Sequence, residues 1–268
     1  MLLYYQYIIM GNIYSTNIVN TKKYGWVRDI PDQRDIYRVP KLNNNKNIVD
    51  LRDKCPGVYN QGKIGSCTAN ALSAAYEYNE IQHNNKTLFV PSRLFIYFNE
   101  RKIENTIDYD SGAQIRDGIK SLKTQGVCSE IDWPYNMDFK EKPYNNCYTE
   151  AVNHKILKYH RIEQDIEHIK SCLSDEYPIV FGFAVYESFE SEHTASTGIM
   201  SLPEENDKLL GGHAVMAVGY NDEKKVIIVR NSWGMEWGDK GYFYMPYEYI
   251  TNRNLCSDFW SIVSTEDN

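Results

Sequence analysis

The first half of the chain carries the hydrophobic spacing of helices. Apolar or small residues recur at three- and four-residue intervals between 67 and 82, which predicts a helix with one buried face. Ser66 stands where a helix-capping side chain is expected, although a neighbouring residue would serve. Two more helices are predicted over 92–104 and over 112–124, the latter ended by Gly126.

The second half shows the pattern of strands. Segments rich in β-branched and aromatic residues predict strands at 154–162, 178–186, 213–220, 225–231 and 241–246, interrupted by a short helix near 165–174. Helices first and strands later predict an α+β protein with two segregated lobes. A cleft between such lobes is where a site that draws on both would lie.

The chain divides into a tail and one larger domain. Residues 1–45 are polar, rich in asparagine and without helical periodicity, so they are expected to form a tail or short arm. Residues 46–268 are expected to form the domain, with a helical lobe over about 60–145 and a β lobe over about 150–260.

Charge and cysteine usage exclude several classes of function. The 36 acidic and 29 basic residues are dispersed, with no concentrated basic face for nucleic acid. No stretch approaches the length of a transmembrane helix. The six cysteines form no C-x-x-C pair, so no metal site is indicated, and scattered cysteines favour a reduced, intracellular protein.

A lipidation pattern lies within the tail. Met10 to Ser15 reads M-G-N-I-Y-S, which fits the N-myristoylation pattern at Gly11. It matters only if translation starts at Met10 or the first nine residues are removed, and a chance match is the alternative. One acyl chain at Gly11 would give only weak membrane association.

Cys67 is the first candidate for chemistry. A cysteine in a helix is usually an inert core residue. Here, however, Gln61 to Cys67 reads Q-G-K-I-G-S-C, which predicts a loop with two glycines that places the thiol at the start of a helix. The positive end of the helix dipole and the unpaired amides stabilise a thiolate at such a position.

His213 and Asn231 are candidate partners of that thiol. His213 follows two glycines and opens a predicted strand, unlike the other five histidines, whose surroundings are unremarkable. Asn231 ends the next strand, so its amide oxygen could accept a proton from the imidazole and fix the tautomer, screened from water by nearby tryptophans. Alone, each feature would suit a structural histidine or a packed turn.

Together the three segments resemble the papain family of cysteine peptidases, over roughly residues 48–260. The run N-S-W-G-M-E-W-G-D-K-G-Y from Asn231 is the most specific match. The resemblance implies Cys67 as nucleophile, His213 as base, Asn231 as its orienter and Gln61 as a side-chain oxyanion donor. It also implies that Gly112, Gln114, Gly212 and Trp233 bind substrate, Gly112 through its backbone in the non-primed subsites and Gln114 near the second subsite.

The chain departs from the family pattern in two places. Ile64 replaces a family cysteine that normally forms a disulfide, and Thr68 replaces an aromatic residue. The tail lacks the usual propeptide pattern, but Tyr24 to Asp35 resembles the lead-in of some disulfide-poor microbial relatives. We expect this tail to lie across the cleft as a short inhibitory arm, or to be a structural or disordered extension.

The resulting expectation is a cysteine endopeptidase that acts on proteins or peptides, needs no cofactor and is a monomer. It would work through a thiolate–imidazolium pair and an acyl-enzyme. The alternatives are a catalytically silent protein of the same fold that serves binding or structure, and an enzyme of the same chemistry that acts on a non-peptide amide.

Overall fold

The computed structural model describes residues 24–41, 46–83, 89–136 and 138–264 of the 268-residue chain. The helices are α1 (Cys67–His83), α2 (Arg93–Ile103), α3 (Ile115–Thr124), α4 (Asn145–Ala151), α5 (Ile166–Ser174), α6 (Glu192–Thr197) and α7 (Tyr247–Thr251). The strands are β1 (Trp26–Val27), β2 (Ile48–Asp50), β3 (Ala113–Gln114), β4 (Lys158–Arg161), β5 (Ile179–Tyr186), β6 (Leu209–Asn221), β7 (Val226–Arg230), β8 (Tyr242–Pro246) and β9 (Cys256–Val263).

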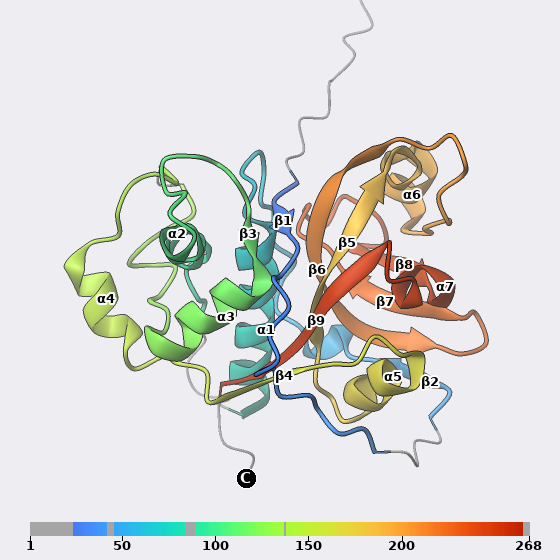
Figure 1. The fold of residues 1–268 in the computed structure, drawn as a ribbon, viewed down its shortest axis with the longest axis horizontal. Helices are drawn as coiled ribbons and strands as arrows, with labels where there is room; N and C mark the ends of the chain where they lie inside the picture. Colours follow the sequence, from blue (N-terminus) through green and yellow to red (C-terminus); the bar gives the residue numbers. More distant parts are fainter. Residues whose placement is uncertain (1–23, 42–45, 84–88, 137, 265–268) are drawn as a thin grey trace, which may run out of the picture.

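The elements form two lobes on either side of α1 (Figure 1). Helices α2, α3 and α4 make the helical lobe, and the other lobe is a sheet in the order β4-β9-β5-β6-β7-β8, with β2 added on β6. Neighbouring strands in this sheet are antiparallel, whereas β1 and β3 form a separate parallel pair between the lobes. The predicted α+β architecture with two lobes is therefore confirmed.

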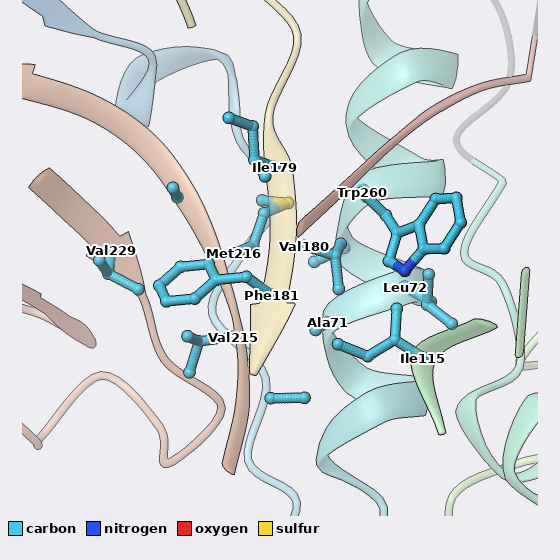
Figure 2. Packing of buried hydrophobic residues seen from close by; sticks show 14 of the residues in the cluster. Ala71, Leu72, Ile115, Ile179, Val180, Phe181, Val215, Met216, Val229 and Trp260 are labelled. Atoms are coloured by element: carbon cyan, nitrogen blue, oxygen red, sulfur yellow. The ribbon is translucent and has the colours of Figure 1, made fainter. Parts of the chain in front are cut away.

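The core joins the lobes through α1. Figure 2 shows Ala71 and Leu72 of α1 facing Val180 and Trp260 of the sheet, while Phe181 points to the opposite face. Successive residues of a strand point to opposite faces, so β5 is apolar on both sides. One side packs on α1, and the other fills the interior of the β lobe. Helix α1, which begins at Cys67, is thus held rigidly between both lobes.

The main predicted helices and strands form, with two kinds of difference. The predicted helix at 112–124 begins only at Ile115, because Ala113 and Gln114 are extended and pair with β1. The elements α4, α6, α7, β1, β2 and β9 were not predicted. At the predicted cap, the Ser66 hydroxyl contacts the Tyr135 hydroxyl and accepts from the Asn70 side chain.

Two of the predictions concern membranes. No helix among the described residues has the length and apolar character needed to cross a bilayer. The lipidation pattern at Gly11 lies outside the described residues.

Candidate active site

Cys67 is the first residue of α1, the helix that lies between the two lobes (Figure 1). The preceding loop turns sharply at Gly62, whose φ of 61° suits glycine, and the Gly65 N–H donates to an Asp110 carboxylate oxygen at 3.0 Å. The thiol therefore sits at the positive end of a buried helix, as predicted.

His213 and Asn231 are brought together by the pairing of β6 with β7. His213 lies on β6, and Asn231 directly follows β7. The His213 Nε2 and Asn231 Oδ1 atoms are 2.8 Å apart, and the Trp233 ring stacks on the imidazole with centroids 5.0 Å apart. Because Asn231 Oδ1 can only accept, the hydrogen must be on Nε2, which leaves Nδ1 as the basic nitrogen of a neutral ring.

The sulfur of Cys67 lies against the backbone that follows His213. The backbone N–H groups of Ala214, which follows His213, and of Gly25 are both directed at the Cys67 sulfur. Cys67 and His213 are each 0% exposed. Both side chains are therefore fully covered, and the backbone that directly follows His213 reaches the Cys67 sulfur.

Gln61 ties the loop before Cys67 to the turn after Asn231. Its Nε2 donates to the Ile64 carbonyl oxygen at 3.0 Å, and its Oε1 accepts from the Ser232 hydroxyl at 2.6 Å. Its backbone N–H also donates to the Ser232 carbonyl oxygen at 2.8 Å. These bonds fix the orientation of the side-chain amide beside the catalytic candidates.

The enclosure of this site is made by the N-terminal arm, which we define as residues 24–41. Strand β1 of the arm pairs in parallel with β3 of the helical lobe and contacts β6 of the other lobe (Figure 1). The Gly25 carbonyl oxygen accepts from the Ala113 N–H at 2.7 Å. A Cβ on Gly25 would lie 1.7 Å from the Gly65 carbonyl oxygen, so only glycine fits at this crossing.

The two residues beside Gly25 fill the cleft on either side of it. The Tyr24 ring meets the rings of His213 and Trp233 edge-on, each at 6.3 Å between centroids, and its hydroxyl donates to Glu190. The Trp26 indole N–H donates to an Asp258 carboxylate oxygen at 3.1 Å. The arm thus spans the cleft from the Trp233 side to the Asp258 side.

The residues predicted to bind substrate contact the arm in this structure. A Cβ on Gly112 would lie 2.0 Å from the Gly25 carbonyl oxygen, and one on Gly212 would lie 2.6 Å from the Trp26 carbonyl oxygen. The Gln114 side-chain oxygen accepts from the Ile30 N–H at 3.1 Å. These positions line the same cleft, which the arm fills.

An ionic cluster holds the next part of the arm. Asp29 accepts from the Trp260 indole at 2.8 Å and from Arg161 at 3.3 Å, and its own N–H donates to Asp258 at 2.8 Å. Asp35 pairs with Arg116, and Arg161 also pairs with Asp258 at 3.1 Å. This cluster was not predicted from the sequence. Its one signal was Asp258, a charge inside the apolar run C-S-D-F-W-S-I-V.

Burial affects the chemistry of the thiol. Burial raises the pKa of Cys67 to about 12, although the N–H groups of Ala214, Gly25 and Thr68 act in the opposite direction. Removing water from an ionisable thiol disfavours the thiolate, which is the nucleophilic form. In this structure Cys67 is fully buried, and its burial favours the thiol over the thiolate.

Comparison with known proteins agrees with this geometry. The family model for papain family cysteine proteases matches residues 46–258. An uncharacterised peptidase C1-like protein of Acanthamoeba polyphaga mimivirus is 44% identical, over 92% of this chain and 88% of its own length. Xylellain, a cysteine protease from Xylella fastidiosa, is 46% identical with a TM-score of 0.87, covering 92% of this chain and 98% of that one. The viral cathepsin of Adoxophyes honmai nucleopolyhedrovirus is 30% identical, but the match covers only 57% of its length.

The fold and these matches define a thiol protease, a hydrolase whose substrates are proteins. The chain belongs to the papain family of cysteine proteases, as its sequence motifs indicated.

Proposed function

We propose that this protein is a cysteine endopeptidase in which Cys67 is the nucleophile and His213 is the base. The observation that carries the proposal is the 2.8 Å contact between His213 Nε2 and Asn231 Oδ1. It fixes the tautomer whose Nδ1 can take the thiol proton, and Cys67 stands at a helix start that stabilises a thiolate once water reaches it.

The reaction follows from these positions. The thiolate attacks the peptide carbonyl, and the resulting oxyanion is stabilised by the Gln61 side-chain amide and the Cys67 backbone N–H, each contributing about 3 kcal/mol. His213 then protonates the leaving amine, and water, activated by the same imidazole, hydrolyses the acyl-enzyme.

The arm acts as an inhibitor in this proposal. Gly25 lies at the Cys67 sulfur, with Trp26 on the Gly112 side and Tyr24 on the Trp233 side. A substrate whose acyl portion lies along the Gly112 segment would run in the opposite direction. The arm is thus bound in reverse, so its own peptide bond is not presented to Cys67 for cleavage.

Active-site labelling tests the function. We expect an epoxide or vinyl-sulfone peptide probe to label the full chain once the arm is displaced, and to lose all labelling in Cys67→Ala. Digestion of a peptide library by the same protein then separates a peptidase from an enzyme acting on other amides. Absence of labelling from an arm-displaced, folded protein would favour the silent alternative.

The ionic cluster makes docking of the arm depend on pH. Burial, together with the charge of Asp258, raises the pKa of Asp29 to about 6 from an ordinary 3.8. Asp29 also faces Arg116, Arg161 and Glu104, and Arg161 pairs with Asp35 as well. The docked arm therefore binds a proton that the free arm releases, and docking weakens as the pH rises through 6.

We expect the ratio of docked to free arm to be roughly tenfold higher at pH 5 than at pH 7. Hydrogen-exchange protection factors for residues 24–35 measure this ratio, because they correct for the intrinsic pH dependence of exchange. Asp29→Asn should remove most of the difference. A difference of the same size in Asp29→Asn would show that another group is responsible.

A further inference from the structure

A tyrosine of the helical lobe reaches the oxyanion loop, which we define as residues 61–66. Tyr135 lies in the segment between α3 and α4, and its hydroxyl donates to the Gln61 carbonyl oxygen at 3.0 Å. The Ser66 hydroxyl also contacts this phenol, and the Asn70 side-chain amide lies 3.4 Å from it. One hydroxyl thus contacts both ends of the loop, beside the oxyanion donor and beside Cys67.

The direction of these hydrogen bonds follows from which atoms can donate. A phenol has a single hydrogen and a carbonyl oxygen can only accept, so the hydrogen of Tyr135 points at the Gln61 carbonyl. The Ser66 hydroxyl must then donate to the Tyr135 oxygen, and the Ser66 oxygen accepts from Asn70 at 3.1 Å. The chain of donors therefore starts on α1 and ends at Gln61.

The Tyr135 ring is fixed by a buried ion pair. The Arg93 guanidinium lies 3.9 Å from the centroid of this ring and 4.6 Å from that of Tyr59. Glu130 accepts from Arg93 at 2.7 Å and from the Tyr135 backbone N–H at 3.1 Å. Burial raises the pKa of Tyr135, although Ser66 and the charge of Arg93 act in the opposite direction. The phenol is therefore held in place and remains a donor at neutral pH.

Gln61 is anchored from both lobes. Ser232, in the turn after β7, binds its backbone N–H at 2.8 Å and its side-chain oxygen at 2.6 Å. Tyr135 binds its carbonyl from the helical lobe. The next residue, Gly62, has a φ of 61°, and a Cβ there would meet nothing within 4 Å, so close packing does not hold this turn. Hydrogen bonds therefore determine where the Gln61 amide points.

We propose that Tyr135 is a positioning residue that holds the oxyanion loop, and with it the Gln61 amide, in the geometry needed for acyl transfer. This inference rests on the peptidase function proposed above. An oxyanion donor works only when its hydrogen is aimed at the place where the charge develops, and a misplacement of about 1 Å can cost roughly 100-fold in rate. Loss of the Tyr135 hydroxyl therefore slows acyl transfer but leaves substrate binding and the reactivity of the thiol in place.

The kinetics of Tyr135→Phe test this role. The parent is the full chain carrying Gly25→Ala, in which the clash with the Gly65 carbonyl oxygen displaces the arm. We expect kcat on a fluorogenic peptide to fall about tenfold or more, the effect of one lost hydrogen bond or a larger misplacement, with KM unchanged. The rate of Cys67 alkylation by iodoacetamide should also stay the same. A fall in alkylation in step with kcat would overturn the proposal, because Tyr135 would then only support the thiol.

Tyr148→Phe is the matched control. It removes a hydroxyl that donates to Asn99 at 3.3 Å, between α4 and α2 of the same lobe. We expect kcat to stay at the level of the parent chain. An unchanged kcat in Tyr135→Phe, or an equal fall in both variants, would speak against a specific role of the Tyr135 hydroxyl.

A double-mutant comparison identifies the group through which Tyr135 acts. In the Gln61→Ala background, Tyr135→Phe should lower kcat little further, because the donor that it positions is gone. A full additional loss of tenfold or more would show that Tyr135 acts on something other than the Gln61 amide.

Hydrogen exchange tests the same contact without catalysis. The Gln61 N–H donates to Ser232, and the Gly65 N–H donates to Asp110 at 3.0 Å. In the otherwise unmodified chain, Tyr135→Phe should increase exchange in residues 61–65, whereas Tyr148→Phe should not. If no peptide is cleaved at all, the proposed peptidase function fails, and this comparison still decides whether Tyr135 holds the loop. Equal protection of residues 61–65 in Tyr135→Phe and in the unmodified chain would show that it does not.

Discussion

The full chain carrying Gly25→Ala is expected to hydrolyse peptides about 100-fold faster than the unmodified chain. The new Cβ would lie 1.7 Å from the Gly65 carbonyl oxygen, a backbone atom on the loop that leads to Cys67. Overpacking of this kind costs about 1–3 kcal/mol, which corresponds to roughly 5- to 150-fold in the population of the free arm. Release would uncover Cys67 and His213, both fully buried under the docked arm.

Gly57→Ala is the matched control for this experiment. A Cβ on Gly57 meets nothing within 4 Å, so the substitution adds the same methyl group without a clash. We expect it to leave activity unchanged. Initial rates on a fluorogenic peptide, together with thiol titration to count accessible Cys67, give the comparison. An unchanged rate in Gly25→Ala, with a folded protein and a reactive thiol, would show that the arm does not limit activity.

The candidate catalytic residues could be found from the sequence because each sits in a short run with a local physical meaning. Cys67 follows a loop with two glycines at the start of a helix, and Asn231 directly follows β7. His213 comes after two more glycines, but it does not open the strand as predicted, because β6 already begins at Leu209. Hairpin-connected strands lie side by side, so the contact between His213 and Asn231 follows from adjacency. The fold class was predicted in the same way, because the spacing of hydrophobic residues changes from that of helices in the first half to that of strands in the second.

The contacts that hold the arm and its ionic cluster could not be derived in that way. The contacts of Trp26 and Asp29 with Asp258 join residues more than 200 positions apart, and no period or spacing encodes them. The two-residue pairing of β1 with β3 is too short to leave a pattern, and it exists only because the cleft supplies the partner edge. Long-range contacts of this kind come from tertiary packing.

Gln61→Ala is expected to lower kcat by about 100- to 1000-fold, measured in the Gly25→Ala background so that the arm does not limit the rate. Removing one oxyanion donor has an effect of this size, because the charge develops only in the transition state. An amide nitrogen carries two hydrogens, so the bond from Gln61 Nε2 to the Ile64 carbonyl oxygen, at 3.0 Å, is compatible with a second one to the oxyanion.

Two comparisons separate this role of Gln61 from a structural one. Ser232→Ala removes the 2.6 Å bond to Gln61 Oε1 but keeps the amide hydrogens, and we expect it to lower kcat only a few-fold. Alkylation of Cys67 by iodoacetamide forms no oxyanion, so its rate should be nearly the same in Gln61→Ala as in the parent chain. If Gln61→Ala loses alkylation and peptidase activity in parallel, the side chain only supports the loop that carries Cys67. If only the peptidase activity is lost, Gln61 is the oxyanion donor.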